Sequence, residues 1–245
     1  MAALKDGDVV RFDYTLWVDG KLLETSEEKV AKANDALREG RNYRPITVTL
    51  GASQIIKGLE SHIRSHGQTG KPVKVEIAPA DGYGERDASK VKDVPMAQFR
   101  SQKVNPEPGM VLNMGGERGV VTRVAGGRVR VDLNHDLAGK ALTYEYTLRE
   151  VLTDEKAKVE AVLANLFPKD SYKVEFAPDA VTIHVPDQVK FDQSWMMAKF
   201  RVVADVRQAT EKKKAIRLVE VFPVLDETGL VPGHEGHAHG PEHQH

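Results

Sequence analysis

Apolar and polar residues alternate near the start of the chain, from Val9 to Val18, and this alternation predicts a half-buried β-strand. One face of the strand would carry Val10, Phe12, Tyr14, Leu16 and Val18. The dipeptide Asp19-Gly20 follows, which is typical of two-residue hairpin turns. We therefore expect a return strand to begin over Lys21 to Glu24.

The next segment has a helical pattern. Thr25 and Glu28 fit a capping box, and Val30, Ala33 and Leu37 after them are spaced as in a short helix that ends before Gly40. Ile46 to Leu50 predicts another strand.

After Gly51, an apolar stripe at helical spacing predicts a second helix, and it consists of Ile55, Ile56, Leu59 and Ile63. Alternation returns in the strand pattern of Val73, Val75 and Ile77. The turn-rich stretch PADGYGERD ends this first region.

The pattern changes from about Arg86 to Leu137. Gly-Gly turns separate three short strand candidates, which are Met110 to Leu112, Gly119 to Val124 and Arg128 to Leu133. This segment predicts a small, separate β module. Strand alternation resumes at Ala141 to Val151, as though an insert had interrupted the first domain.

A second α+β unit is expected over residues 153–224. Thr153 to Phe167 predicts a helix that stops at Pro168, and a hairpin should follow across Pro178-Asp179. Its two strands would be Tyr172 to Phe176 and Val181 to Val185.

Gln193 to Gln208 fits both a strand and a helix, because Phe200, Val202, Ala204 and Val206 alternate. Its length and the cluster of Trp195, Met196 and Met197 favour a helix. Ala215 to Phe222 would be the closing strand, which completes an αββαβ order. Residues 225–245, rich in Gly, Pro and His, are expected to be disordered.

Composition narrows the classes of function. The chain has 245 residues, is 40% hydrophobic and 29% charged, and carries a formal net charge of -1, so nucleic acid and membrane surfaces are not expected partners. The absence of cysteine excludes disulfides, cysteine nucleophiles and thiolate-held metal sites. We see neither the apolar region of a signal peptide nor an apolar run of about 20 residues, so we expect a cytoplasmic protein.

Four motifs, in this order, carry a specific resemblance: FDYTLWVDGKLLETS, GASQIIKGLE, DGYGERD and LNHDLAGKALTYEYTL. The chain resembles FKBP-type peptidyl-prolyl cis-trans isomerases, above all the SlyD-like and long archaeal members, over roughly residues 6–152. The resemblance implies an α+β fold in which a twisted antiparallel half-barrel wraps one helix. Residues 1–85 and 138–152 would form the isomerase domain, and residues 86–137 the insert-in-flap chaperone domain.

The resemblance also implies a prolyl pocket built from Tyr14, Leu23, Glu24, Ile55, Ile56, Leu59, Tyr83 and Tyr144. Four of these depart from the commonest family pattern: Leu23 replaces Phe, Glu24 replaces Asp, Leu59 replaces Trp and Tyr144 replaces Phe. These departures bear on macrolide inhibitors more than on catalysis. Taken singly, the apolar residues also fit an ordinary core, whereas Tyr83 lies in a turn where a purely structural role is least expected.

Rotation about an X–Pro bond crosses a barrier of about 18–20 kcal/mol that arises from amide resonance, so the reaction needs neither a nucleophile nor a cofactor. A dry apolar pocket would favour the twisted amide over the planar one. The Tyr83 hydroxyl and the Ile56 N–H would hold substrate carbonyls, and Glu24 would orient neighbouring donors.

The insert has two interpretations. Its apolar residues either fill a small core or bind unfolded chains, as the equivalent module does in SlyD-like proteins, and flexible methionines suit the second role. The candidate substrate-binding residues are Met96, Phe99, Met110, Leu112, Met114 and Val120.

The segment GHEGHAHGPEHQH offers five imidazoles, which suit Ni, Cu or Zn. The candidate ligands are His234, His237, His239, His243 and His245. An engineered tag is the alternative. In the C-terminal unit, His184 is interpreted as structural, and the resemblance suggests oligomerisation or further client binding.

Three functions therefore compete. The first is an isomerase that acts on proline-containing, unfolded or partly folded polypeptides with the help of its insert. The second is a non-catalytic holdase chaperone. The third is a nickel-binding metallochaperone.

Overall fold

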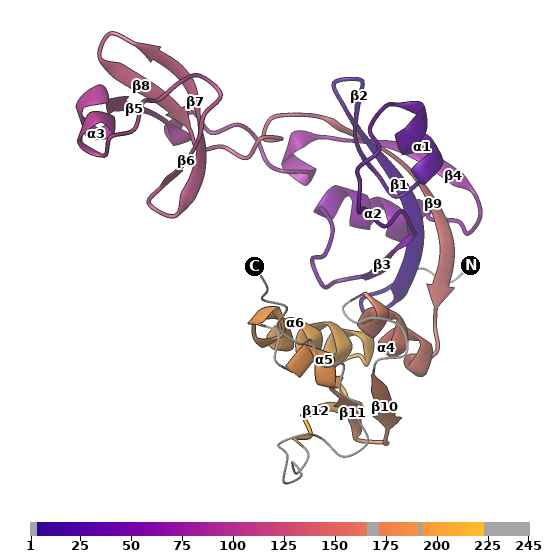
Figure 1. Ribbon diagram of the computed structural model, residues 1–245. Helices are drawn as coiled ribbons and strands as arrows, with labels where there is room; N and C mark the ends of the chain where they lie inside the picture. Colours follow the sequence, from indigo (N-terminus) through magenta and orange to yellow (C-terminus); the bar gives the residue numbers. More distant parts are fainter. Residues whose placement is uncertain (1–3, 166–171, 191–192, 223–245) are drawn as a thin grey trace, which may run out of the picture.

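The computed structural model describes residues 4–165, 172–190 and 193–222 (Figure 1). This part of the chain contains three β-sheets, each with its own apolar core, and a small number of helices. The expected α+β class is confirmed. None of the helices described is long and apolar enough to cross a membrane.

The first sheet is organised around β1 (Val9–Val18), which pairs antiparallel with β9 (Leu142–Leu152) along its whole length. The other edge of β1 is shared between two strands. β3 (Ile46–Thr49) pairs with the first half of β1, and β2 (Lys21–Thr25) pairs with the second half. β4 (Pro72–Ile77) lies beyond β9.

One helix, α2 (Lys57–His66), lies inside the curve of this sheet and packs Leu59 and Ile63 into the core (Figure 1). The half-barrel on one helix is therefore present. The helix begins later than the apolar stripe predicts, because Ile56 has an extended backbone with φ -62° and ψ 145°. Ile55 and Ile56 reach the core from the loop before the helix.

The capping-box prediction is wrong. Helix α1 (Glu28–Ala33) has Glu27 at its N-cap without a side-chain cap, and it ends well before Gly40. Thr25 cannot cap it because Thr25 is the buried end of β2, where its hydroxyl bonds to the Thr15 hydroxyl at 2.9 Å. Leu37 follows the helix and is exposed.

The second sheet lies within the insert and has the order β5-β8-β7-β6. Three of its strands, β6 (Val111–Met114), β7 (Glu117–Ala125) and β8 (Arg128–Asp132), are those predicted from the sequence. β5 (Val91–Pro95) and helix α3 (Met96–Ser101) were not predicted, because each is too short to show a clear period.

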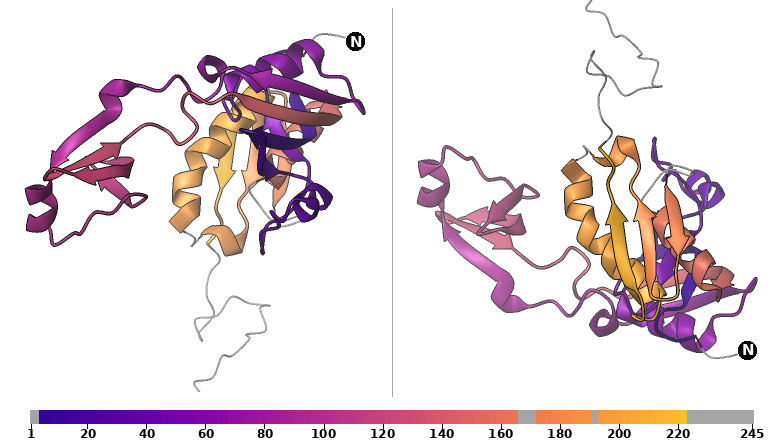
Figure 2. Two further views of the ribbon diagram at one scale, coloured as in Figure 1. Left: turned by 90° about the horizontal axis from the view of Figure 1, so that it is seen from above. Right: turned by 90° about the horizontal axis from the view of Figure 1, so that it is seen from below.

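The insert stands apart from the first sheet, to which two chain segments connect it (Figures 1 and 2). One segment contains two short 3₁₀ turns, Pro79–Asp81 and Ala88–Lys90. The two segments are tied together by an ion pair between Arg86 and Asp132 and by a 2.8 Å hydrogen bond from Gly139 N–H to Gly84 O.

The third sheet contains the hairpin of β10 (Lys173–Phe176) and β11 (Ala180–His184), with β12 (Ala215–Val219) parallel to β11. The predicted strand to Phe222 is thus shorter in the structure. A parallel pair needs a crossover connection, and helices supply it here.

That connection contains α5 (Asp187–Lys190), which was not predicted, and α6 (Gln193–Ala209), which confirms the helical interpretation. Helix α4 (Glu155–Ala164) packs beside α6 and begins later than predicted, with Asp154 as its cap. The predicted end of that helix at Phe167 and Pro168 lies outside the described residues.

The third sheet and its helices rest against the first sheet. Val9 and Leu152, from β1 and β9, belong to the same apolar cluster as α4 and α6. The buried Lys158 amine of α4 lies 3.4 Å from the Asp8 carboxylate.

Candidate functional site

Two tyrosines lie side by side on the first sheet. Tyr14 of β1 and Tyr144 of β9 have ring centroids 6.2 Å apart. Burial raises the pKa of Tyr14 to about 12, and the neighbouring Glu24 adds to this shift. Burial also raises the pKa of Tyr144, with further contributions from Tyr83, Tyr14 and Glu24. Both hydroxyls therefore keep their protons at neutral pH and can donate hydrogen bonds.

Glu24 comes from β2 and forms an ion pair with Arg41 at 2.7 Å. This pairing suits an orienting role for the carboxylate. Leu23 beside it occupies a β-bulge, because Leu16 pairs with Glu24 and Trp17 pairs with Leu22. Leu23 is 39% exposed and lies outside the apolar cluster that contains Ile55, Ile56 and Leu59.

The segment entering α2 supplies the apolar residues. Ile55 and Ile56 are half-buried, whereas Leu59 is 2% exposed and lies in the core with Tyr144. Among the residues described, none accepts a hydrogen bond from the Ile56 N–H. That donor is available to a substrate carbonyl.

Tyr83 lies in the loop after β4 and stacks on His135, with ring centroids 4.3 Å apart and planes 4° apart. The His135 ring is oriented by its Nδ1, which accepts a hydrogen bond from Leu137 N–H at 3.1 Å. His135 was not predicted as a site residue. The sequence could have pointed to His135 because it belongs to the NHDLAGK motif. In the structure this motif lies beside the DGYG turn.

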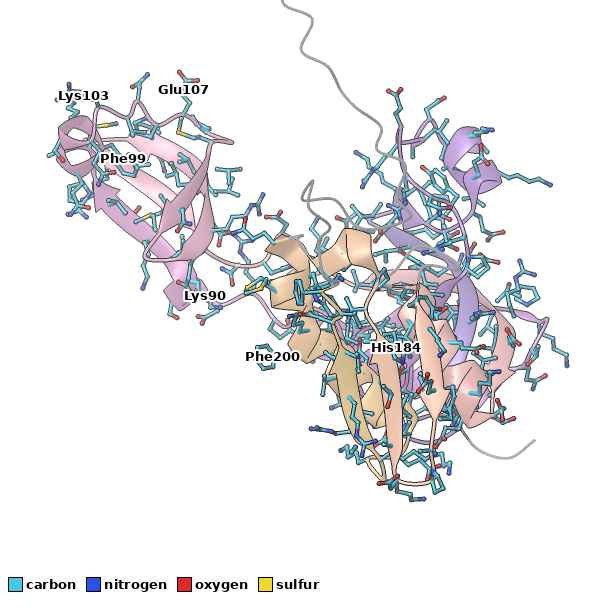
Figure 3. All side chains as sticks on the ribbon, turned by 60° about the horizontal axis from the view of Figure 1, so that its bottom comes forward. Lys90, Phe99, Lys103, Glu107, His184 and Phe200 are labelled. Atoms are coloured by element: carbon cyan, nitrogen blue, oxygen red, sulfur yellow. The ribbon has the colours of Figure 1, made fainter. Side chains whose placement is uncertain are left out.

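The insert contains a cavity of about 270 Å³ between α3 and the end of β6. Phe99 is buried in the core of the insert and points inward in Figure 3, and Leu112 and Met114 also line the cavity. Met96 and Val120 are half-buried, and Met110 is exposed at 36%. The six candidate residues thus divide between the core and the surface of the insert.

The five expected tail ligands, His234, His237, His239, His243 and His245, lie outside the described residues. Within the part of the chain that the structure describes, no three His, Asp or Glu side chains gather to hold a metal ion. His184 lies 3.2 Å from Glu175, a neighbour on the paired strand, in keeping with a structural role.

A comparison with known proteins decides the family. The short-type peptidyl-prolyl cis-trans isomerase of Methanocaldococcus jannaschii is 36% identical over 148 residues, which cover 60% of this chain and 94% of that protein. The chain belongs to the FKBP-type peptidyl-prolyl cis-trans isomerase family. Relatives of this FKBP-type chain also include the SlyD isomerase of Helicobacter pylori, 30% identical over 54% of this chain and 71% of that protein. The SlyD isomerase of Treponema pallidum is 32% identical over 58% and 75%.

Three family models match different parts of this FKBP-type chain. The model for FKBP-type peptidyl-prolyl cis-trans isomerases matches residues 2–100. The model described as FKBP26, IF domain matches residues 92–137, and the FKBP26 C-terminal model matches residues 155–223. The resemblance to SlyD-like and long archaeal members is thereby confirmed.

Proposed function

We propose that this FKBP-type isomerase catalyses cis/trans isomerisation of X–Pro bonds in front of the loop that enters α2. The supporting observation is that three polar groups, Tyr14, Glu24 and Tyr83, converge on Tyr144 from different segments of the chain. Tyr14 and Tyr144 belong to the same apolar cluster as Ile55 and Ile56.

The chemistry needs only binding and desolvation. Apolar contact with Ile55 and Ile56 strips water from the prolyl ring, which disfavours the planar, charge-separated amide. The Ile56 N–H and the Tyr83 hydroxyl hold the flanking carbonyls of the substrate. These contacts bind the twisted amide more tightly than the planar amide and so lower the barrier to rotation. No cofactor takes part in such a rotation.

The Tyr83→Phe variant tests this proposal. Loss of one neutral hydrogen bond of about 0.5–1.5 kcal/mol should lower kcat/KM by about 2- to 10-fold. The measurement is a protease-coupled assay on a short prolyl peptide. Since Tyr83 is 38% exposed, the variant should keep the parent's unfolding midpoint.

Tyr172→Phe is the matched control, because it removes a hydroxyl that bonds to Glu160 O in the C-terminal unit. Equal rates for the two variants would contradict the role of Tyr83. If the parent chain itself left the peptide's isomerisation rate unchanged, the non-catalytic holdase would be favoured instead.

A second proposed function is chaperone binding by the insert. Its support is the 270 Å³ cavity lined by Phe99, Leu112 and Met114, in a small sheet that stands away from the first sheet. Capture of an unfolded chain there would raise the concentration of X–Pro bonds near the slower isomerase site.

Three narrower predictions accompany these proposals. Nickel, copper or zinc binding by the tail histidines would appear in a metal titration of the full chain against one with those histidines replaced. A cytoplasmic location would appear in cell fractionation. Oligomerisation through the C-terminal unit would appear in light scattering.

A further inference from the structure

A second group of ring side chains lies along the side of α2 that faces β4, and none of its members belongs to the expected prolyl pocket. His62 and His66 are four residues apart, one helical turn, so they lie on the same face. Their rings stack with centroids 4.5 Å apart and planes 19° apart. Two imidazoles thus present neighbouring nitrogens on a rigid element.

The core of the sheet holds one of these rings in place. His62 Nδ1 lies 2.9 Å from the hydroxyl of Tyr146, a residue that is almost fully buried in β9. When Nδ1–H donates to that hydroxyl, the lone pair of Nε2 points away from the core. Metal-binding histidines are oriented in the same way, with the second ring nitrogen donating to a fixed acceptor.

Among the residues described, no carboxylate forms an ion pair with either ring. A cation beside the two rings would therefore compete with no ion pair for their nitrogens.

The rings open into a surface depression of about 450 Å³ between α2 and β4. Glu76 and Asp81 line the same depression, together with the hydroxyl-bearing Ser61 and Ser65. A cation on the two imidazoles would therefore have room for water and a negative field nearby.

We infer that His62 and His66 form a two-imidazole binding site for a late first-row divalent cation, Ni²⁺, Cu²⁺ or Zn²⁺. Imidazole nitrogen suits these ions, and Mg²⁺ and Ca²⁺ prefer oxygen ligands. Two histidines four residues apart on a helix are an established arrangement for holding zinc. The site uses no residue of the tail or of the prolyl pocket, so it stands whether or not the proposed function does.

The test uses the full-length chain with His234, His237, His239, His243 and His245 replaced by Asn, which we call the tail-silent chain. Calorimetric titration with Ni²⁺ should give one bound ion per chain, and Mg²⁺ should give none. His66→Ala in the tail-silent chain should weaken Ni²⁺ binding by at least about tenfold. Tyr146→Phe, which removes only the orienting hydroxyl, should weaken it by about 10- to 100-fold.

His184→Asn is the matched control, because it removes a half-buried imidazole elsewhere in the fold and should leave Ni²⁺ affinity unchanged. Peptide isomerase activity of the His66→Ala chain should equal that of its parent, which shows that it is folded. In NMR spectra of the tail-silent chain, Zn²⁺ should shift the ring resonances of both His62 and His66.

Absence of Ni²⁺ binding by the tail-silent chain would overturn the inference. So would equal affinities for the His66→Ala and His184→Asn chains, or Zn²⁺ shifts that spare both rings.

Discussion

At the scale of single residues, the contact between Tyr83 and His135 links the candidate catalytic loop to the exit of the insert. The two rings are almost parallel, and His135 is itself fixed by the Leu137 N–H. A half-exposed tyrosine in a glycine-flanked turn would otherwise sample several rotamers. We therefore interpret His135 as a positioning residue for the Tyr83 hydroxyl.

His135→Ala should lower kcat/KM for a short prolyl peptide by about 2- to 10-fold, because a stacked aromatic pair contributes about 0.5–1.5 kcal/mol. His135→Phe retains a planar ring and should restore most of the activity. Adding Tyr83→Phe to His135→Ala should cause little further loss, since both changes remove one positioned hydroxyl. Fully multiplicative losses would show that His135 acts independently of Tyr83.

At the scale of elements, the insert is joined at a narrow neck. Leu133 N–H donates to Lys90 O at 3.0 Å, and Gly139 N–H donates to Gly84 O at 2.8 Å. The first bond continues the β5–β8 ladder, whereas the second lies outside the sheet of the insert and is joined by the Arg86–Asp132 ion pair. We therefore expect the DGYG turn and His135 to stay in place when the sheet above Asp132 is removed.

Deletion of residues 91–131, with Lys90 joined to Asp132 through Gly-Gly so that the Arg86–Asp132 ion pair is kept, should leave peptide isomerisation within about twofold of the parent. Catalysis of the refolding of a proline-limited protein should fall by far more, because the captured client no longer raises the local concentration of X–Pro bonds. The two rates are measured on the same preparation. Parallel losses in both assays would contradict the division of labour between the pocket and the insert.

The sequence predicted the long elements better than the short ones. The strand from Val9 to Val18 was predicted correctly because its alternation repeats several times, and the helix from Gln193 was predicted correctly because its length outweighed a competing alternation. α1 was misplaced because Thr25 ends β2 and its hydroxyl accepts from the Glu27 N–H ahead of the helix and not from the Glu28 N–H that a capping box requires. The bulge at Leu23 depends on the register between β1 and β2. The stacking of His135 on Tyr83 depends on two loops that meet only in the folded chain. Neither can be predicted from a local sequence pattern.

At the scale of the whole molecule, α6 closes the third unit onto the first. Asp205 of α6 is buried, and Gln54 from the loop after β3 lies beside it together with Arg201. Burial raises the pKa of Asp205, although Arg201 and Gln54 partly offset the shift. The folded protein therefore binds this proton more tightly than the unfolded chain does.

It follows that ionisation of Asp205 costs stability as the pH rises above the unfolded value of 3.8. Asp205→Asn should raise the urea midpoint at pH 7, and the gain should vanish below about pH 3, where Asp205 is mostly protonated in both states. Asp179→Asn, at an exposed carboxylate 3.9 Å from Arg217, should change little at either pH. A lower midpoint for Asp205→Asn at pH 7 would show that the Arg201 pair outweighs burial.

Strand β9 has a mechanical consequence. It starts just after the neck of the insert and ends two residues before the Asp154 cap of α4, so tension between a client on the insert and the C-terminal unit runs along it. β9 is paired antiparallel with β1 over ten residues and with β4 over six. Because such a pull enters one end of β9 and leaves at the other, the already extended backbone of β9 carries it, and the hydrogen bonds to β1 and β4 are not unzipped one by one. The strand would thus act as a tether that lets the isomerase hold a client under force without losing its own fold.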